Sequence, residues 1–364
     1  MARVDAFNAG KFARDDEYYT RYEDIQNEMN YYKSEFEGKI VLCNCDDPYE
    51  SNFCKFFLKN FNYLKLKKLI CTSYGGSPVI CKQLVLFDEL DEPVVPDNGY
   101  VIEITSMPMK NGRGVTDEDI TSLLKSKRRG VRKLKSNGDF RSAECIEYLK
   151  EADIVVTNPP FSLFREYVAQ LIEYNKKFII IGRETSITFK DTFQYILDGK
   201  AWYGYTHAKE FIRPDGTTKS FGNVTWFTNL DVSKRHEKFI SYRNYTEEGY
   251  EHYYNYDGIN IPAVSEIPSD YYGMMGVPLS FLDCWNPEQF EIIGLGQTVP
   301  KKILHKTSKN GETIDFIDTV TDEIVYQVPY SVQERKRGNQ LRIDENGKPG
   351  RVPFGRLVIR RIKK

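Results

Sequence analysis

The stretch Asp153-Ile154-Val155-Val156-Thr157-Asn158-Pro159-Pro160-Phe161 joins four strand-forming residues to a polar, proline-rich corner. Isoleucine and valine favour a buried strand, and consecutive prolines fix the backbone where such a strand ends. An ordinary strand followed by a Pro-Pro turn would have the same local pattern. The apolar run before the prolines and the aromatic residue directly after them favour a functional corner over that alternative.

The chain before this corner predicts a parallel sheet. Residues 39–45 are expected to form a buried strand, residues 53–61 carry phenylalanine at helical spacing, and residues 67–74 are expected to form the next strand. Strand, loop, helix and strand in this order are typical of a βαβ unit. Residues 201–205 and 224–228 are expected to be late strands that include one antiparallel edge strand. The sequence therefore predicts an α/β fold with a mostly parallel, Rossmann-like sheet.

The chain of 364 residues is longer than one ordinary domain. Its alternation of strands and helices is interrupted over residues 75–137, where strands at 79–87 and 100–106 are expected to form an inserted hairpin before a basic segment. The alternation stops near residue 231. We therefore predict a catalytic domain over residues 1–230, with the insertion, and a C-terminal region over residues 231–364.

Net charge, cysteine spacing and the length of apolar runs argue against several classes of protein. The net charge is −1 at pH 7, so contact with a polyanion must depend on local patches. The seven cysteines show no paired CxxC spacing, which argues against zinc and favours reduced, mostly buried thiols. No apolar run approaches the length of a membrane helix. We expect a cytoplasmic protein with no metal and no membrane partner.

A charged loop, residues 43–53, follows the first predicted strand at the edge where an α/β sheet binds its ligand. Asp46 and Asp47 could bind hydroxyl or ammonium groups, and Ser51 and Asn52 could cap the next helix. The loop lacks the glycines that a dinucleotide pyrophosphate requires. A cationic ligand without phosphates, such as S-adenosylmethionine, fits better, and a simple capped turn is the alternative.

A second candidate ligand segment is Gly138-Asp139-Phe140. The Asp139 carboxylate could accept a hydrogen bond from the adenine amine of such a donor, and Phe140 could pack on its ring. A helix N-cap before Ala143 is an alternative from the local sequence. Farther along, residues 183–186 follow a predicted strand end and could line a base pocket, or could form an exposed loop.

A basic run occupies residues 125–135 and contains seven cations. A solvated face is the usual explanation of such a run, and contact with nucleic-acid phosphates is the functional one. We take its central members as candidate DNA contacts: Lys127, Arg128, Arg129, Arg132 and Lys133.

The corner resembles the catalytic motif of amino-methyltransferases that act on adenine. An exocyclic amine conjugated to a purine is a poor nucleophile, because its lone pair is delocalised into the ring. Two acceptors, the Asn158 side-chain oxygen and the Pro159 carbonyl, would favour a pyramidal nitrogen with a localised lone pair. Pro160 helps to hold that carbonyl still, and Phe161 offers a face on which the base can stack.

The whole chain resembles the EcoRI-type adenine-specific DNA methyltransferase family. The similarity runs in order over roughly residues 15–295 and is weaker beyond them. It rests on these segments: Asp16-Glu17-Tyr18-Tyr19-Thr20, Cys43-Asn44-Cys45-Asp46-Asp47-Pro48, Gly138-Asp139-Phe140-Arg141-Ser142, the corner with Ser162-Leu163-Phe164-Arg165-Glu166, Asn223-Val224-Thr225-Trp226-Phe227-Thr228, and Met275-Gly276-Val277-Pro278-Leu279-Ser280-Phe281. The first loop lacks the glycine-rich pattern of the wider superfamily, and Thr72-Ser73-Tyr74 stands where an acidic residue is usual.

The resemblance implies methyl transfer from S-adenosylmethionine to adenine N6 in double-stranded DNA, with the target base flipped out. It implies that the corner, Asn158 to Phe161, is catalytic and that Asp139 and Phe140 hold the adenine of the donor. The residues implied to contact the methionine part of the donor are Tyr19, Thr20, Asn44, Cys45, Asp46, Asp47, Pro48, Ser51, Asn52 and Phe53. The C-terminal region, helped by the insertion, would recognise the target.

Such enzymes are bacterial or phage-encoded, and a cognate restriction endonuclease acting on the same site is a possible counterpart. Two alternatives remain at this point. The same fold could methylate RNA or a protein glutamine, or a degenerate copy could serve as a non-catalytic DNA-binding subunit.

Overall fold

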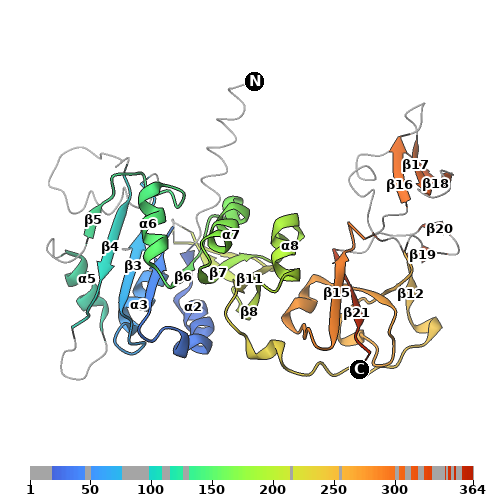
Figure 1. Ribbon diagram of the computed structural model, residues 1–364, viewed down its shortest axis with the longest axis horizontal. Helices are drawn as coiled ribbons and strands as arrows, with labels where there is room; N and C mark the ends of the chain where they lie inside the picture. Colours follow the sequence, from blue (N-terminus) through green and yellow to red (C-terminus); the bar gives the residue numbers. More distant parts are fainter. Residues whose placement is uncertain are drawn as a thin grey trace. The chain divides into compact units, whose positions relative to one another are not determined.

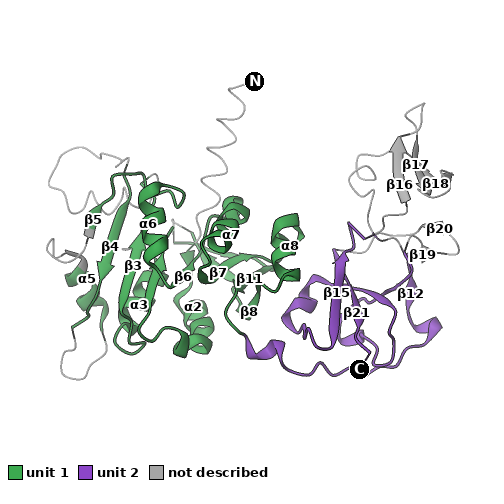
Figure 2. Cartoon of the chain, viewed as in Figure 1, with its two compact units in different colours: residues 1–231 green, residues 232–364 purple. Residues whose placement is uncertain are grey.

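The computed structural model describes residues 19–45, 51–75, 98–108, 115–125, 131–213, 216–253, 256–299, 303–307, 313–318, 324–329, 341, 343–345, 348–349 and 355–363. The chain divides into two compact units, residues 1–231 and residues 232–364 (Figure 2). Within the described part of the chain, no helix is both long enough and apolar enough to cross a bilayer.

Unit 1 is built on an eight-stranded sheet with the order β5-β4-β3-β2-β6-β7-β11-β8 (Figure 1). Its strands are β2 (Ile40–Cys43), β3 (Lys68–Thr72), β4 (Tyr100–Ile104), β5 (Val131–Lys133), β6 (Ile154–Thr157), β7 (Lys177–Arg183), β8 (Trp202–His207) and β11 (Val224–Thr228). The central strands β3, β2, β6 and β7 are parallel, whereas β4 and β11 run antiparallel to their neighbours. The prediction of an α/β fold with a mostly parallel sheet is confirmed.

Helices cover both faces of this sheet. Neighbouring residues of a strand point to opposite faces. On β11, Trp226 meets Phe53 with ring centroids 5.9 Å apart, and Phe227 meets Phe164 at 5.0 Å. The helices of these two phenylalanines therefore lie on opposite faces. Among the described residues, the helices of unit 1 are α2 (Tyr22–Met29), α3 (Asn52–Asn60), α5 (Asp117–Lys125), α6 (Ala143–Glu151), α7 (Phe164–Glu173) and α8 (Lys190–Leu197).

Two strands occupy other places than the sequence predicts. The antiparallel strand β11 is not at the edge, because β8 pairs with it on the side away from β7. All residues of β11 are buried, which requires a neighbour on each side, whereas β8 is only partly buried and suits an edge. Strand β4 joins the main sheet instead of an inserted hairpin, since pairing with β3 buries Val101, Ile102 and Ile104. The other strand predicted for that hairpin lies outside the described residues.

A buried carboxylate fixes the edge strand β8. Glu28, on α2, accepts hydrogen bonds from the backbone nitrogens of Tyr205 (2.8 Å) and Thr206 (2.7 Å) and from the hydroxyl of Tyr32 (2.9 Å). Burial raises the pKa of the Glu28 carboxyl. Gly204 leaves room for this contact, because a Cβ there would lie 2.2 Å from Glu28 Oε1.

A small three-stranded sheet also belongs to unit 1. It has the order β1-β9-β10 and contains β1 (Tyr19–Thr20), β9 (Glu210–Ile212) and β10 (Thr218–Ser220). Both pairings are antiparallel, so the start of the described chain is bonded to a hairpin that follows β8.

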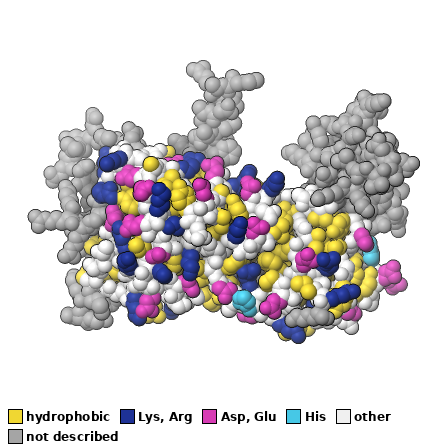
Figure 3. All heavy atoms as spheres, viewed as in Figure 1, with side chains coloured by type: hydrophobic (Ala, Val, Ile, Leu, Met, Phe, Trp, Pro, Cys, Tyr) yellow, Lys and Arg dark blue, Asp and Glu magenta, His cyan; other side chains and the backbone are white. Residues whose placement is uncertain are grey.

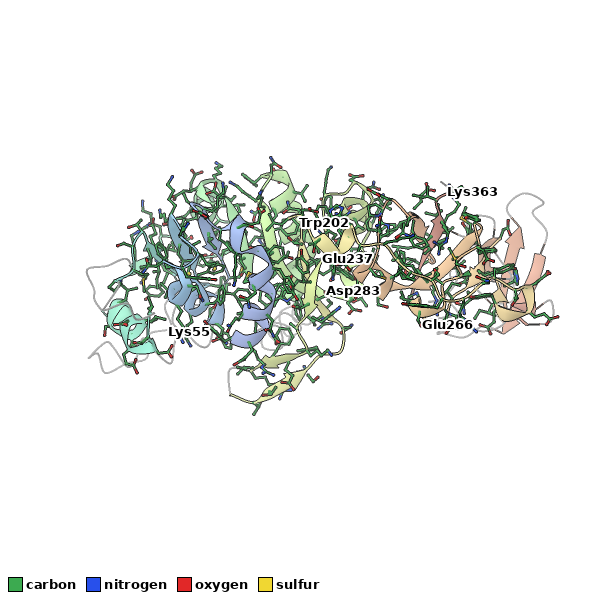
Figure 4. The ribbon with its side chains drawn as sticks, turned by 90° about the horizontal axis from the view of Figure 1, so that it is seen from below. Lys55, Trp202, Glu237, Glu266, Asp283 and Lys363 are labelled. Carbon is green, nitrogen blue, oxygen red and sulfur yellow. The ribbon has the colours of Figure 1, made fainter. Side chains whose placement is uncertain are left out.

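Unit 2 contains a five-stranded sheet with the order β12-β13-β14-β21-β15. Its strands are β12 (Glu251–His252), β13 (Ile259–Asn260), β14 (Met274–Pro278), β15 (Phe290–Leu295) and β21 (Arg356–Arg361). A three-stranded sheet holds β16 (Ile303–Thr307), β17 (Thr313–Asp318) and β18 (Ile324–Pro329), and β19 (Asp344–Glu345) pairs with β20 (Lys348–Pro349). Two contacts hold the first segment of the unit, near residues 234–237. Lys234 forms an ion pair with Asp283 (3.5 Å), and the Asn286 amide donates to the Glu237 carbonyl (3.0 Å) (Figure 4).

Short 3-10 segments connect these elements. They are Asn30–Glu35, Phe161–Leu163, Glu184–Thr188, Ser233–Arg235, Glu247–Gly249, Val264–Glu266 and Leu279–Asp283.

Candidate active site

The corner of residues 158–161 lies at the carboxyl end of β6, between β2 and β7 in the middle of the sheet. All of β6 is buried, Pro159 is buried, and Asn158 and Phe161 are half-buried. Pro160 is extended, with φ −53° and ψ 125°, and its carbonyl accepts from the backbone nitrogen of Leu163 (3.0 Å). Parallel strands open their carboxyl ends to the same edge, so the corner faces the loops that follow β2, β3 and β7.

The loop of residues 43–53, called the first loop, is hydrogen-bonded to the residue directly before this corner. Asn44, directly after β2, is buried and accepts at its backbone carbonyl from the hydroxyl of Thr157, the last residue of β6. The Asn44 side-chain oxygen accepts from the hydroxyl of Tyr167 on α7. The next residue, Cys45, has a φ of 64°, in the left-handed region. The structure therefore brings Asn44 and Cys45 beside the corner, whereas Asp46, Asp47 and Pro48 lie outside the described residues.

The segment of Tyr19 and Thr20 adjoins the start of α3. Ser51 caps this helix by accepting from the backbone nitrogen of Phe53 (3.1 Å), and the Asn52 amide donates to the Thr20 carbonyl (2.8 Å). The Thr20 hydroxyl oxygen is buried and has no hydrogen-bond partner among the described residues. A buried hydroxyl in this situation fits a polar ligand, and so these residues are suited to hold part of a methyl donor.

The second loop, residues 138–140, packs tightly against the end of β3. A Cβ at Gly138 would lie 1.9 Å from the Ser73 carbonyl oxygen, and one at Gly99 would lie 2.2 Å from the same atom. Gly138 has a φ of +79°. These glycines therefore allow the second loop to lie beside the end of β3 and the start of β4, because they have no side chain.

Asp139 does not cap the following helix, since Ser142 accepts from the backbone nitrogen of Cys145 (3.3 Å) in that role. The Asp139 carboxylate instead binds the Arg141 guanidinium through two hydrogen bonds, of 2.9 and 2.7 Å. Hydrogen bonds from the Arg141 side chain lower the pKa of the Asp139 carboxyl. Arg141 also pairs with Glu166 at the start of α7 (2.7 Å). The second loop is thus linked to the helix that follows the corner.

Phe140, the next residue of this loop, is buried. Its ring meets the Tyr167 ring edge to face, with centroids 5.0 Å apart. Its carbonyl accepts from the Gln170 amide (3.3 Å). One helix, α7, therefore contacts both candidate donor-binding loops.

An aromatic cluster that sequence reasoning did not identify surrounds Phe161. Its ring lies 6.4 Å from Phe211, on β9, and 6.4 Å from Phe221, directly after β10. The Arg183 guanidinium, at the end of β7, lies 5.3 Å from the Phe161 ring centroid. The turn-forming residues Pro214-Asp215-Gly216 between the two phenylalanines are the sequence signal that indicates a hairpin here.

The basic run is described only in part, because Lys127, Arg128 and Arg129 lie outside the described residues. Arg132, on β5, pairs with Glu103 (2.9 Å) and Glu144 (3.5 Å), and Lys133 is exposed on the same strand. On the face of unit 1 seen in Figure 3, basic and acidic side chains are interspersed. Arg132 is therefore part of a network of ion pairs within unit 1.

Comparison with known proteins shows which family the chain belongs to. The family model described as adenine-specific methyltransferase EcoRI matches residues 6–362. The type II methyltransferase M.EcoRI of Escherichia coli is 41% identical over 319 residues, which cover 82% of this chain and 91% of that protein. The type II methyltransferases M.MgeORF184P of Mycoplasma genitalium and M.MpnI of Mycoplasma pneumoniae are each 35% identical over 310 residues, or 79% of this chain and 85% and 84% of theirs. No solved structure matches the chain.

The fold and these matches define a methyltransferase, an enzyme class that requires a methyl donor. More particularly, the chain belongs to the EcoRI family of adenine-specific methyltransferases. The prediction of an adenine-specific DNA methyltransferase from the corner and the ordered segments is thereby confirmed.

Proposed function

We propose that the protein transfers the methyl group of S-adenosylmethionine to N6 of an adenine that is flipped out of double-stranded DNA at a specific site. The observation that carries this proposal is the hydrogen bond from Thr157 to the Asn44 carbonyl, which joins the first loop to the residue before Asn158. A donor bound at the end of β2 would then lie next to an amine held by the corner. The strand order, with β11 inserted antiparallel between β7 and β8, supports a Rossmann-like class I methyltransferase sheet.

In this proposal, the donor-binding residues come from three segments of unit 1. Tyr19, Thr20 and the first loop hold the methionine part, where the buried Thr20 hydroxyl supports a polar ligand. Asp139 and Phe140 hold the adenine. A carboxylate has several acceptor positions, so its pairing with Arg141 leaves capacity for the donor amine. When bound, S-adenosylmethionine supplies an electrophilic methyl group on its sulfonium.

The corner and the aromatic cluster would receive the target base. The Asn158 side-chain oxygen and the Pro159 carbonyl accept the two N–H groups of the adenine amine, which favours a localised lone pair on nitrogen as transfer begins. Phe161 stacks on the base, and Phe211 and Phe221 hold the Phe161 ring by edge-to-face contacts. Flipping a base costs a few kcal/mol, which stacking and the new hydrogen bonds offset.

Recognition of the DNA site belongs, in this proposal, to residues 231–364, with phosphate contacts from Lys127, Arg128, Arg129, Arg132 and Lys133. Unit 2 has exposed aromatic and cationic side chains suited to DNA. Tyr242 is 84% exposed, and Lys363 lies 5.4 Å from the ring of the exposed Tyr272. A restriction endonuclease acting on the same site is the proposed counterpart.

The test is transfer of tritiated methyl from S-adenosylmethionine into unmethylated duplex DNA, followed by identification of the modified base. We expect N6-methyladenine from the wild type. Asn158→Ala should lower turnover at least about a thousandfold and leave donor affinity within about threefold, because it removes an acceptor that acts on the transition state. Asn62→Ala, in a loop before β3, is the matched control and should keep full activity. Undiminished activity of Asn158→Ala, or preferential methylation of RNA or protein in competition, would contradict the proposal.

A further inference from the structure

A buried tyrosine of α7 lies where the candidate donor-binding segments and the corner meet. Tyr167 is fully buried, on the same helix face as Phe164, Val168 and Leu171. Its ring packs edge to face on Phe140 of the second loop, at 5.0 Å and with an interplanar angle of 71°. A phenylalanine would fill this position equally well, so packing alone does not explain the hydroxyl.

The hydroxyl has a specific partner in the first loop. It donates to the side-chain oxygen of Asn44, which is itself buried. The backbone carbonyl of the same residue accepts from the Thr157 hydroxyl, which is also buried. Asn44 is therefore fixed through both its side chain and its main chain, by one residue of α7 and one residue of β6.

Fixing Asn44 also restricts the residue directly after it, Cys45. Cys45 adopts a φ of 64°, which a residue other than glycine adopts only where its surroundings impose it. Buried hydrogen bonds of this kind hold one conformation firmly, because a donor or acceptor left without its partner away from water is unfavourable. The two bonds on Asn44 therefore hold the described start of the first loop, Asn44 and Cys45, at the end of β2.

We propose that Tyr167 is a positioning residue, which acts through Asn44 to hold the described start of the first loop, Asn44 and Cys45, in place relative to the second loop. This inference rests on the proposed function, since it takes the first loop as the site of the methionine part of the donor. The Tyr167 ring supports Phe140 on the adenine side, and its hydroxyl supports Asn44 on the methionine side. A single side chain thus sets the spacing between the two halves of the donor site.

The primary test is Tyr167→Phe, which keeps the ring and removes the hydroxyl. We expect the dissociation constant for S-adenosylmethionine, measured by isothermal titration calorimetry, to rise about tenfold, as the loss of one buried hydrogen bond predicts. The turnover number at saturating donor and the affinity for duplex DNA should change less than about threefold. A rise in the donor KM with a nearly constant kcat is the pattern of a residue that orders the donor site.

Tyr32→Phe is the matched control. Tyr32 is another buried tyrosine of unit 1, and its hydroxyl donates to Glu28 at 2.9 Å, outside the candidate site. It should lower thermal stability as much as Tyr167→Phe does, with unchanged donor affinity. If the two variants lose stability equally and both keep wild-type donor affinity, Tyr167 has only a structural role and the inference is wrong.

A double-mutant cycle shows whether the hydroxyl acts through Asn44. In the background of Asn44→Ala, Tyr167→Phe should have no further effect on donor affinity, whereas independent action would give additive losses. Should Asn44→Ala fail to fold, Thr157→Val provides a second background that removes the other bond to Asn44. There the two losses should again be non-additive, and additivity would contradict the inference. If the wild type itself bound no S-adenosylmethionine, the proposed function would fail before this inference was reached.

Discussion

The two loops of the candidate donor site are held by different kinds of contact. At the described start of the first loop, Asn44 accepts buried, neutral hydrogen bonds from Thr157 and Tyr167. The second loop depends on the close approach of Gly138 to the end of β3 and on the partly exposed ion pair of Asp139 with Arg141. Buried neutral bonds are insensitive to salt, whereas exposed ion pairs are weak and screened. We therefore expect the two loops to respond differently to salt and to substitutions.

The largest effect is expected from Gly138→Ala. A Cβ there would meet the Ser73 carbonyl oxygen at 1.9 Å, and the φ of +79° disfavours alanine as well. We expect a loss of about 3 kcal/mol in the free energy of unfolding and a loss of donor binding. Urea denaturation and calorimetry measure these quantities.

Gly199→Ala separates backbone strain from steric overlap. Gly199 has a φ of +65° but nothing within 4 Å of the added Cβ. It should cost only about 1 kcal/mol and leave donor affinity unchanged. Equal losses for the two variants would show that the close approach to Ser73 does not hold the second loop.

A smaller effect is expected from Arg141→Leu, which leaves Asp139 and Glu166 without their cation. The Arg141 side chain is 48% exposed, so the free energy of unfolding should fall by less than about 1 kcal/mol. Donor affinity should fall about threefold at low salt and differ less from wild type at high salt. Titration at two salt concentrations measures both.

The control for this variant is Arg165→Leu, which removes the ion pair of a comparably exposed arginine with Asp191 on α8 (2.7 Å). Its donor affinity should equal that of the wild type at either salt concentration. If the donor affinity of Tyr167→Phe depended on salt in the same way as that of Arg141→Leu, the two loops would not be held by different kinds of contact.

The smallest effect is a pH dependence. Arg141 lowers the folded-state pKa of the Asp139 carboxyl below its ordinary value of 3.8. The stabilisation is therefore complete above the unfolded-state pKa and is lost as pH falls through the lowered folded-state pKa. The difference in stability between wild type and Arg141→Leu should be constant above about pH 5 and disappear in stronger acid. A difference that grew on acidification would contradict this cause of the shift.

The sequence predicted the local elements of the site well. The apolar run of β6 and the prolines after it are a local signal, and the structure has a buried strand that ends at Thr157. Ser51 was one of two expected caps of α3 and is the residue that caps it. The roles of individual residues in binding the donor, the base and the DNA remain predictions.

Non-local pairing was harder to predict. The place of β11 depends on which strands flank it, and no periodicity within Val224–Thr228 encodes that choice. The contact of Phe161 with Phe211 and Phe221 needs the β9–β10 hairpin, whose strands are only three residues each. Tyr167 occupies an ordinary core position of an amphipathic helix, and its partner Asn44 is 123 residues away in the chain. Its hydroxyl therefore carries no sequence signal of its own.

The carboxylate of Glu28 beneath β8 bears on self-association of the protein. An edge strand with unused backbone donors can pair with a strand of another molecule and start aggregation. In β8, the backbone N–H groups of Tyr205 and Thr206 are already bonded to Glu28. Gly204 allows these hydrogen bonds to form, because any side chain at this position would displace the Glu28 carboxylate. Replacing Glu28 or Gly204 would leave these backbone N–H groups free to pair with another molecule. The yield of soluble protein would then fall before catalytic activity did.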